Sequence, residues 1–164
     1  SWLNRLNHTV FLKKRENFRK AFANFHIDVI ARFDSRNVDQ LLGDAGIVRH
    51  RGKIESTINN AKRAQELRAE FGSLAAFVWQ FEPPPKSRPK RLDRSALLEM
   101  AVTPESTAMS KELKRRGWSF VGPTTMYAFM QAAGIVNDHM PGCAVREQCE
   151  AARKDFEVSF ARCC

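Results

Sequence analysis

The chain has 164 residues, 43% of them hydrophobic, with a formal net charge of +9 at pH 7 and a pI near 9.8. That length suffices for one domain with a buried core, and the charge favours a polyanionic partner, nucleic acid before membrane. No apolar run approaches the ~18 residues that span a bilayer and no secretory signal is visible, so we expect neither a membrane protein nor a secreted one.

The four cysteines all lie in the last part of the chain, at positions 143, 149, 163 and 164. A disulfide framework would distribute them along the sequence, so we expect a reducing, cytoplasmic setting. The chain opens with Ser1-Trp2 rather than Met, in what reads as the middle of an element. We therefore expect a fragment or a truncated product.

The first predicted helix runs from Thr9 to Phe25. Its apolar residues have the spacing of one buried stripe: Val10, Phe11, Phe18, Ala21, Phe22 and Phe25. The other face is basic, with Lys13, Lys14, Arg15, Arg19 and Lys20. We interpret this face as solvated surface, with a phosphate-facing surface as the alternative.

Two short helical pieces follow, over residues 28–33 and 38–42, and Asp34-Ser35 caps the second of them. A turn at residues 45–47 then leads into a longer helix that runs from Lys53 to Leu67.

A basic loop precedes that longer helix and contains Arg49, His50, Arg51 and Lys53. We interpret it as a second candidate phosphate contact. His50 lies between two arginines, and we expect it to be an exposed surface residue rather than a catalytic one.

The middle of the chain combines an aromatic-rich segment with a proline-rich one. Residues 71–81 predict a short core helix, whereas residues 82–94, EPPPKSRPKRLDR, cannot form regular secondary structure. We interpret residues 82–94 as an exposed linker, with an arm lying along DNA as the alternative. A helix over residues 105–116 then begins after Thr103-Pro104.

The stretch from Arg115 to Cys143 organises the chain. A tight hairpin at Val121-Gly122-Pro123 precedes an amphipathic helix that runs from about Thr124 to Gly134. Thr124 or Thr125 could cap this helix, and Gly122 removes the Cβ that would block a close approach. Unpaired N–H groups at the helix start suit a phosphate oxygen, although an ordinary Gly-Pro turn is the alternative.

Basic residues precede the hairpin: Lys111, Lys114, Arg115 and Arg116. No alternating strand pattern occurs, so we expect an all-α architecture of short helices. Residues 1–143 would form the domain, and residues 144–164 a charged tail to which we assign neither order nor function.

Several motifs occur in a specific order: SW at the start, LKKREN (12–17), DAGIVRHRGKI (44–54), FVWQF (77–81), LKRRGWSFVGPTTMYAFMQAAGIVNDH (113–139) and a final His139-x3-Cys143. From about Leu12 to Cys143 this order resembles the bacterial 3-methyladenine DNA glycosylase I family of the helix-hairpin-helix superfamily. The resemblance implies an all-helical fold and hydrolysis of the N-glycosidic bond of N3-methylated adenine after base flipping.

The resemblance also implies site residues. Gly122, Thr124 and Thr125 would contact DNA phosphate, with Lys53 and the loop around Arg49 as weaker candidates. Trp2 matches the family's base-stacking tryptophan. The family's recognition glutamate and a pocket tyrosine lie in a segment before Ser-Trp, so this chain would lack them and its catalytic residue is unknown.

A structural zinc ion is a further implication. His139 and Cys143 match the family's terminal pair of ligands, and the other pair would lie in the segment before Ser-Trp. Two ligands cannot complete a tetrahedral structural site.

Asn137 stands where many superfamily members carry an aspartate. A cationic methylated base is already a good leaving group, so strong acid or nucleophilic assistance is less necessary. We expect the neighbouring Asp138 to be structural rather than catalytic.

We therefore expect a DNA repair glycosylase that acts on double-stranded alkylated DNA as a monomer. A helix-hairpin-helix fragment that binds DNA but is catalytically impaired is the alternative, and a purely structural helical domain is a third.

Overall fold

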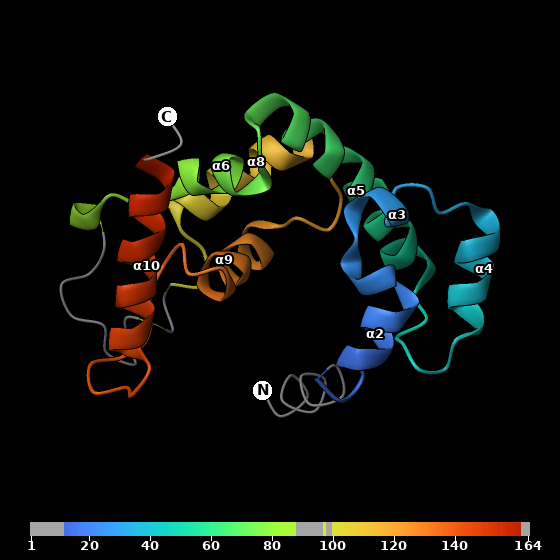
Figure 1. Ribbon diagram of the computed structural model, residues 1–164, viewed down its shortest axis with the longest axis horizontal. Coiled ribbons are helices and arrows are strands. Elements are labelled where there is room, and N and C mark those ends of the chain that lie inside the picture. Colours follow the sequence, from blue (N-terminus) through green and yellow to red (C-terminus); the bar gives the residue numbers. More distant parts are fainter. Residues whose placement is uncertain (1–11, 88–96, 98–99, 162–164) are drawn as a thin grey trace. The chain divides into compact units, whose positions relative to one another are not determined.

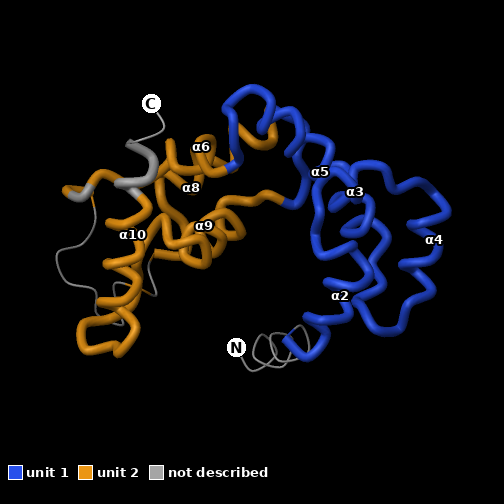
Figure 2. The backbone as a smooth tube through the Cα atoms, viewed as in Figure 1, with its two compact units in different colours: residues 1–74, 116–120 blue, residues 75–115, 121–164 orange. Residues whose placement is uncertain are grey.

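The computed structural model describes residues 12–87, 97 and 100–161 of the chain. Within these residues every regular element is a helix, which confirms the predicted all-α class (Figure 1). The chain divides into two compact units, Ser1–Leu74 with Arg116–Phe120 and Ala75–Arg115 with Val121–Cys164 (Figure 2). The predicted division at residue 143 stays a prediction.

The first unit is built on the long helix α5 (Arg51–Phe71), against which α3 (Ile27–Ile30) and α4 (Ser35–Gly43) pack (Figure 1). Helix α2 (Arg15–Ala21) and a 3-10 turn, η1 (Ala23–Phe25), precede α3. The core of this unit consists of Phe22, Ile30, Val38, Leu41, Ile47, Ile54, Ile58 and Ala61.

Helix α5 forms where the sequence predicts it because one stripe of its residues is apolar. Ile54, Ile58 and Ala61 follow the helical repeat and are buried. The helix ends at Gly72, whose φ of 78° is a conformation that glycine adopts without strain.

The first helix is shorter than predicted. The predicted span was Thr9–Phe25, of which residues 9–11 lie outside the described part, and α2 ends at Ala21. The reason is that the backbone of Ala23, Asn24 and Phe25 has φ values of 47°, 56° and 58°, which interrupts the helical repeat. Phe25 is consequently 50% exposed instead of lying in the buried stripe.

Asp34 caps α4, as the sequence predicts, but the helix begins at Ser35, three residues before the predicted span over residues 38–42. Asp34 accepts hydrogen bonds from the amides of Arg36 (2.9 Å) and Asn37 (3.2 Å), and Asn37 Oδ1 accepts one from the Asp34 amide. These reciprocal bonds satisfy N–H groups that the helix itself cannot pair.

In the described part of the second unit the elements are α6 (Leu74–Val78), whose first residue belongs to the first unit, η2 (Trp79–Phe81), η3 (Pro85–Ser87), α8 (Pro104–Arg115), α9 (Pro123–Ala132) and α10 (Arg146–Ala161). The predicted aromatic helix over residues 71–81 is therefore wrong at its start, because α5 continues through Phe71 and the turn at Gly72 separates it from α6. Helices α8 and α9 pack together, burying Met109, Leu113, Met126 and Met130.

Helix α8 spans Pro104–Arg115, one residue earlier at each end than the predicted 105–116, and the proline lies in its first turn as expected. Thr103 Oγ1 accepts from the Ser106 amide (3.2 Å), and Ser106 Oγ accepts from the Thr103 amide (3.0 Å). The prediction that residues 82–94 form no regular secondary structure is wrong at Pro85–Ser87, which form a single 3-10 turn, because proline is tolerated in the first turn of a helix; residues 88–94 lie outside the described part.

The segment after Cys143 forms helix α10, which is tied into the second unit. Arg153 donates to the Gly134 carbonyl (2.6 Å) and the Ile135 carbonyl, and its guanidinium pairs with Glu82. The rings of Phe156 and Trp79 stack with centroids 4.8 Å apart. Among the described helices, none combines the length and the apolar character needed to cross a membrane.

Candidate nucleic-acid interface

The hairpin helix α9 begins one residue earlier than predicted. Its first residue is Pro123, and Gly122 is the N-cap, with no side-chain cap. The prediction that Thr124 or Thr125 caps the helix is therefore wrong, because both threonines lie inside the first turn, where they are exposed. The predicted stop at Gly134 is confirmed by its φ of 73°.

Gly122 is not required by the described fold. Its φ of −64° is open to any residue, and a Cβ built there would meet no described atom within 4 Å. The first N–H groups of a helix have no partner inside it, so the amides of Thr124 and Thr125 are donors for an outside acceptor. Because Gly122 has no side chain, there is room for a phosphate beside these amides.

The hairpin is held in place by α8. Val121 is 5% exposed, and its carbonyl accepts a hydrogen bond of 2.7 Å from the buried Ser110 Oγ. This bond fixes the carbonyl that immediately precedes Gly122.

The residues before the hairpin, Arg116–Phe120, form a strap that belongs to the first unit. Asn60 Oδ1 accepts from the Ser119 amide (3.0 Å), and Asn60 Nδ2 donates to the Ser119 carbonyl (2.9 Å). Ser56 Oγ donates to the same carbonyl (3.2 Å), and Asn59 Nδ2 donates to the Gly117 carbonyl (2.9 Å). The strap is thus fastened to α5 along its length.

The arginines next to the hairpin are engaged by acids. Arg116 pairs with Glu70, at 2.9 Å from Nη2 to Oε1, and lies over the Phe71 ring. Arg115 pairs with Glu112 at 2.6 Å. Both belong to the basic residues that precede the hairpin in the sequence, and their charges are matched inside the protein.

The second basic loop contains the residue that starts α5. His50 is exposed, as predicted, and its Nδ1 accepts a hydrogen bond of 3.2 Å from the Lys53 amide. Arg51 pairs with Asp39 (3.1 Å) and Glu55 (3.5 Å), and the hydrogen bond to Asp39 raises the pKa of Arg51. Arg49 and Lys53 are exposed beside them.

The capping role of His50 was missed by sequence reasoning. The usual cap residues are Ser, Thr, Asp and Asn. The position of His50, immediately before the apolar repeat of α5, was the available signal.

His139 and Cys143 lie together, with 3.5 Å between Nδ1 and Sγ. Their spacing lets both atoms reach one metal ion. In the described part of the chain, however, no group of three or more His, Cys, Asp or Glu side chains could hold a metal. A tetrahedral structural zinc site needs four donors, so these two residues alone do not fit one.

Asp138 has a structural setting, as predicted. Its Oδ2 accepts hydrogen bonds from the Tyr127 hydroxyl (2.6 Å) and from Gln131 Nε2 (2.7 Å). Asn137 Nδ2 donates to Glu150 Oε1 (2.7 Å). Tyr127 is buried in the core, and Trp2 lies outside the described residues.

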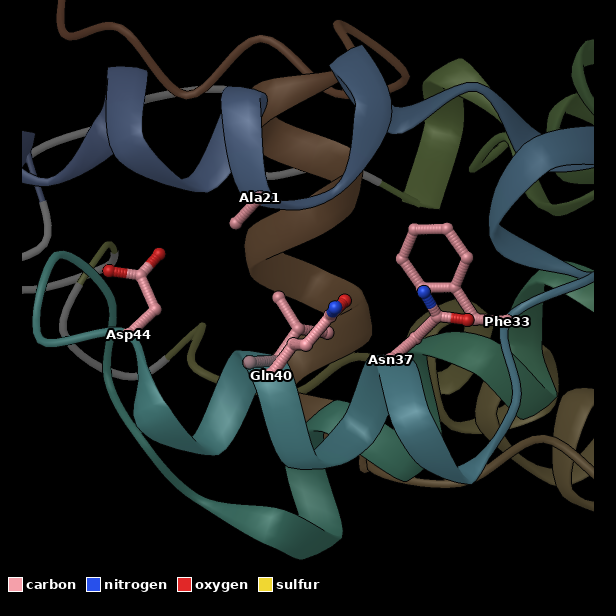
Figure 3. Close-up of a pocket in the computed structure, with 6 residues that line it drawn as sticks. Ala21, Phe33, Asn37, Gln40 and Asp44 are labelled. Atoms are coloured by element: carbon pink, nitrogen blue, oxygen red, sulfur yellow. The ribbon is translucent and has the colours of Figure 1, made fainter.

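Two cavities lie in the first unit. One, of about 220 Å³, lies between α2 and α4 (Figure 3), and two of its polar side chains take part in local turns. Asp44 Oδ1 accepts from the Gly46 amide, and Asn37 belongs to the α4 cap. The other, of about 230 Å³, is mainly apolar, lined by Phe18, Phe22, Phe25, Val48, Lys53, Ile54 and Thr57.

Comparison with known proteins places this geometry in context. The family model described as methyladenine glycosylase matches residues 3–147. The chain is 43% identical over 133 residues to DNA-3-methyladenine glycosylase 1 of Escherichia coli K12, covering 80% of this chain and 70% of that protein. It is 38% identical over 133 residues to DNA-3-methyladenine glycosylase of Haemophilus influenzae, with the same two shares covered.

Solved structures agree. A crystal structure of 3-methyladenine DNA glycosylase I matches with a TM-score of 0.72 and 41% identity, covering 88% of this chain and 75% of that one. A structure of the Staphylococcus aureus enzyme, described as the basis of 3-methyladenine recognition, matches with a TM-score of 0.74 and 31% identity, covering 84% and 72%. A variant enzyme in complex with 3-methyladenine matches with a TM-score of 0.71 and 28% identity, covering 84% and 73%.

Proposed function

Since the chain belongs to the methyladenine glycosylase family, we propose that it is a DNA repair enzyme that excises 3-methyladenine from alkylated DNA. The observation that carries this proposal is the 43% identity over 133 residues to an enzyme named for that reaction. The open space beside Gly122 and the exposed threonines of α9 support a contact with the DNA backbone.

The reaction is hydrolysis of the bond between C1′ of the deoxyribose and N9 of the base. Water supplies the hydroxyl group that joins C1′, its proton is released, and the bonding pair leaves with the base. Because the N3-methylated base is a cation, it departs as a neutral molecule and requires little acid assistance. The base must first leave the helical stack to become accessible.

Several roles are part of the same proposal. Gly122, Thr124 and Thr125 would bind a phosphate through backbone amides, Arg49 and Lys53 would attract other phosphates of the duplex, and Trp2 would stack on the flipped base. Asp138 is not offered as the catalytic group, because its Oδ2 is occupied by Tyr127 and Gln131.

We also propose that the chain acts as a monomer on double-stranded DNA in the cytoplasm. Support for a reducing compartment comes from the free thiols of Cys143 and Cys149. Gel filtration with light scattering would test the monomer, and competition between single- and double-stranded oligonucleotides would test the preferred form of DNA.

A zinc ion is a proposal that rests on the pair His139 and Cys143. It requires two further ligands in addition to this pair. Metal analysis of the purified chain and of His139→Ala would test it: one zinc per chain, lost in the variant, supports the site, and a metal-free protein removes it.

The test of the enzymatic proposal is release of free 3-methyladenine from methylated duplex DNA by this chain. Release above that of a heat-inactivated sample is expected. If the chain binds the duplex but releases no base, the alternative raised from the sequence is favoured, namely a DNA-binding protein that is catalytically impaired.

A further inference from the structure

Phe120 is an aromatic residue in a conformation that phenylalanine rarely adopts. Its φ is 57°, and its side chain is 58% exposed. A positive φ is unfavourable for a bulky side chain, and a largely exposed ring contributes little burial energy in return. Neither backbone preference nor packing therefore accounts for phenylalanine at this position.

The surrounding hydrogen bonds impose this conformation. Ser119, the preceding residue, is bonded through its amide, its carbonyl and its hydroxyl to Asn60 and Ser56 of α5. A strained backbone persists only where neighbouring contacts over-determine it. The strap thus holds the Phe120 ring in a fixed position on the surface of the first unit.

The ring lies at the beginning of α5. Its edge meets the His50 ring, with centroids 6.3 Å apart and planes at 83°. A Cβ built on Gly52 would be 3.8 Å from Phe120 Cζ, which places the ring over the first turn of the helix. Arg49 and Lys53 are exposed at the same turn. We call these four residues (Arg49, His50, Lys53 and Phe120) the Phe120 surface.

An exposed ring among cations complements the DNA backbone, in which an apolar sugar edge follows each phosphate. We propose that Phe120 packs against a deoxyribose of the bound duplex while Arg49 and Lys53 pair with the adjacent phosphates. The inference rests on the proposed function, to which it adds a positioning residue. Such a contact carries no sequence information and fixes how the duplex lies on the protein.

The test compares wild type with Phe120→Gly on a methylated duplex and on the same duplex unmodified. We expect the variant's Kd to rise about fivefold to tenfold on both, the effect of losing one apolar packing contact. The slope of log K against log salt should not change, because no phosphate pair is lost. Phe120→Tyr, which keeps the ring, should bind like wild type.

The melting temperature of Phe120→Gly distinguishes a contact with DNA from a role of Phe120 in stabilising the fold. Glycine accepts a positive φ without strain, so Phe120→Gly should melt at the wild-type temperature or up to about 4 °C above it. Phe25→Gly is the matched control, since Phe25 has a φ of 58° and is 50% exposed. It should leave DNA affinity unchanged.

The inference would be overturned, without affecting the proposed function, if Phe120→Gly bound DNA as tightly as wild type. It would also be overturned if Phe120→Gly bound more weakly but melted well below wild type, because loss of folded structure would then explain the weaker binding. A wild-type chain that binds no DNA would overturn it together with the proposed function. Base release by wild type, measured separately, shows which of the two proposals has failed.

Discussion

At the scale of single residues, the described part of the fold does not require glycine at position 122. Its φ is ordinary and the space beside it is open, so neither strain nor packing inside the described residues selects glycine. A backbone that an oxygen of DNA must approach does select it, because any Cβ stands where the partner would lie.

Gly122→Val should therefore weaken DNA binding without destabilising the protein. We expect an affinity loss of about tenfold, equivalent to about 1.4 kcal/mol, the value of one hydrogen bond to a charged group. Fluorescence anisotropy with a duplex measures the affinity, and a thermal melt measures the stability.

Gly43→Val is the control for that variant, because a Cβ at Gly43 also meets no described atom within 4 Å. It should leave DNA binding unchanged. An equal loss in both variants would mean that the hairpin has no special role.

At the scale of elements, Arg153 makes several of the contacts that hold α10 in the second unit, beside the Phe156–Trp79 stack and the Asn137–Glu150 hydrogen bond. Arg153 lies 18% exposed, bonds two backbone carbonyls at the end of α9 and pairs with Glu82. Gly134 and Ile135 follow Ala133, the C-cap of α9, so their carbonyls lie outside the helix and accept from Arg153.

Arg153→Ala should lower the free energy of unfolding by about 2 kcal/mol, the range for hydrogen bonds to a charged group. That corresponds to a melting temperature about 4–8 °C lower for a chain of this size. Lys154→Ala, an exposed neighbour of the same charge, should melt like wild type. A melting temperature unchanged by Arg153→Ala would show that α10 is not fastened in this way.

Helices α3 and α5 are joined by a carboxylate. Asp28 accepts from Arg68 Nη2 (2.6 Å) and Gln65 Nε2 (2.8 Å). The hydrogen bond from Arg68, followed by that from Gln65, lowers the pKa of Asp28 from 3.8 to about 2. Folding thus favours the ionised carboxylate.

The stability from Asp28 should be fully present above about pH 4 and be lost as the pH falls through about 2, because the lowered pKa belongs to the folded state. Asp28→Asn should have a lower melting temperature than wild type at pH 7, and this difference in melting temperature should disappear between pH 4 and pH 2. Glu16 forms an exposed ion pair with Arg19 at 3.9 Å, so Glu16→Gln should have nearly the melting temperature of wild type at any pH. A difference for Asp28→Asn that is constant with pH would contradict the linkage.

At the scale of the whole molecule, the net charge of +9 favours DNA over other partners, but only exposed, unmatched cations make it effective. Arg115 and Arg116 are matched by Glu112 and Glu70. Arg49 and Lys53 are exposed at the start of α5 and are the better candidates for phosphates.

Arg49→Ala and Lys53→Ala should each weaken DNA binding on any sequence and reduce the slope of log K against log salt by about one. Lys62→Ala removes the same charge from an exposed position farther along α5 and should leave that slope unchanged. Equal effects of all three variants would mean that net charge alone, rather than this loop, drives binding.

Much of the fold could be read from the sequence because its signals are local. The apolar repeat gave α5, the Asp34 cap gave α4, Pro104 marked the start of α8, and Gly134 marked the end of α9. Each signal depends on residues within about one turn of one another, so no knowledge of distant contacts is needed. The order of the motifs then identified the family, which the comparisons confirm.

Tertiary structure alone decided which residues of the candidate interface are available. The matching of Arg116 by Glu70, the fastening of Ser119 to Asn60 and the docking of Arg153 beside Glu82 all join residues far apart in the chain. The left-handed backbone at Phe120 follows from such contacts, since its own residue type disfavours it. Contacts of long sequence separation leave no periodic trace in the sequence, and for that reason only the folded chain reveals them.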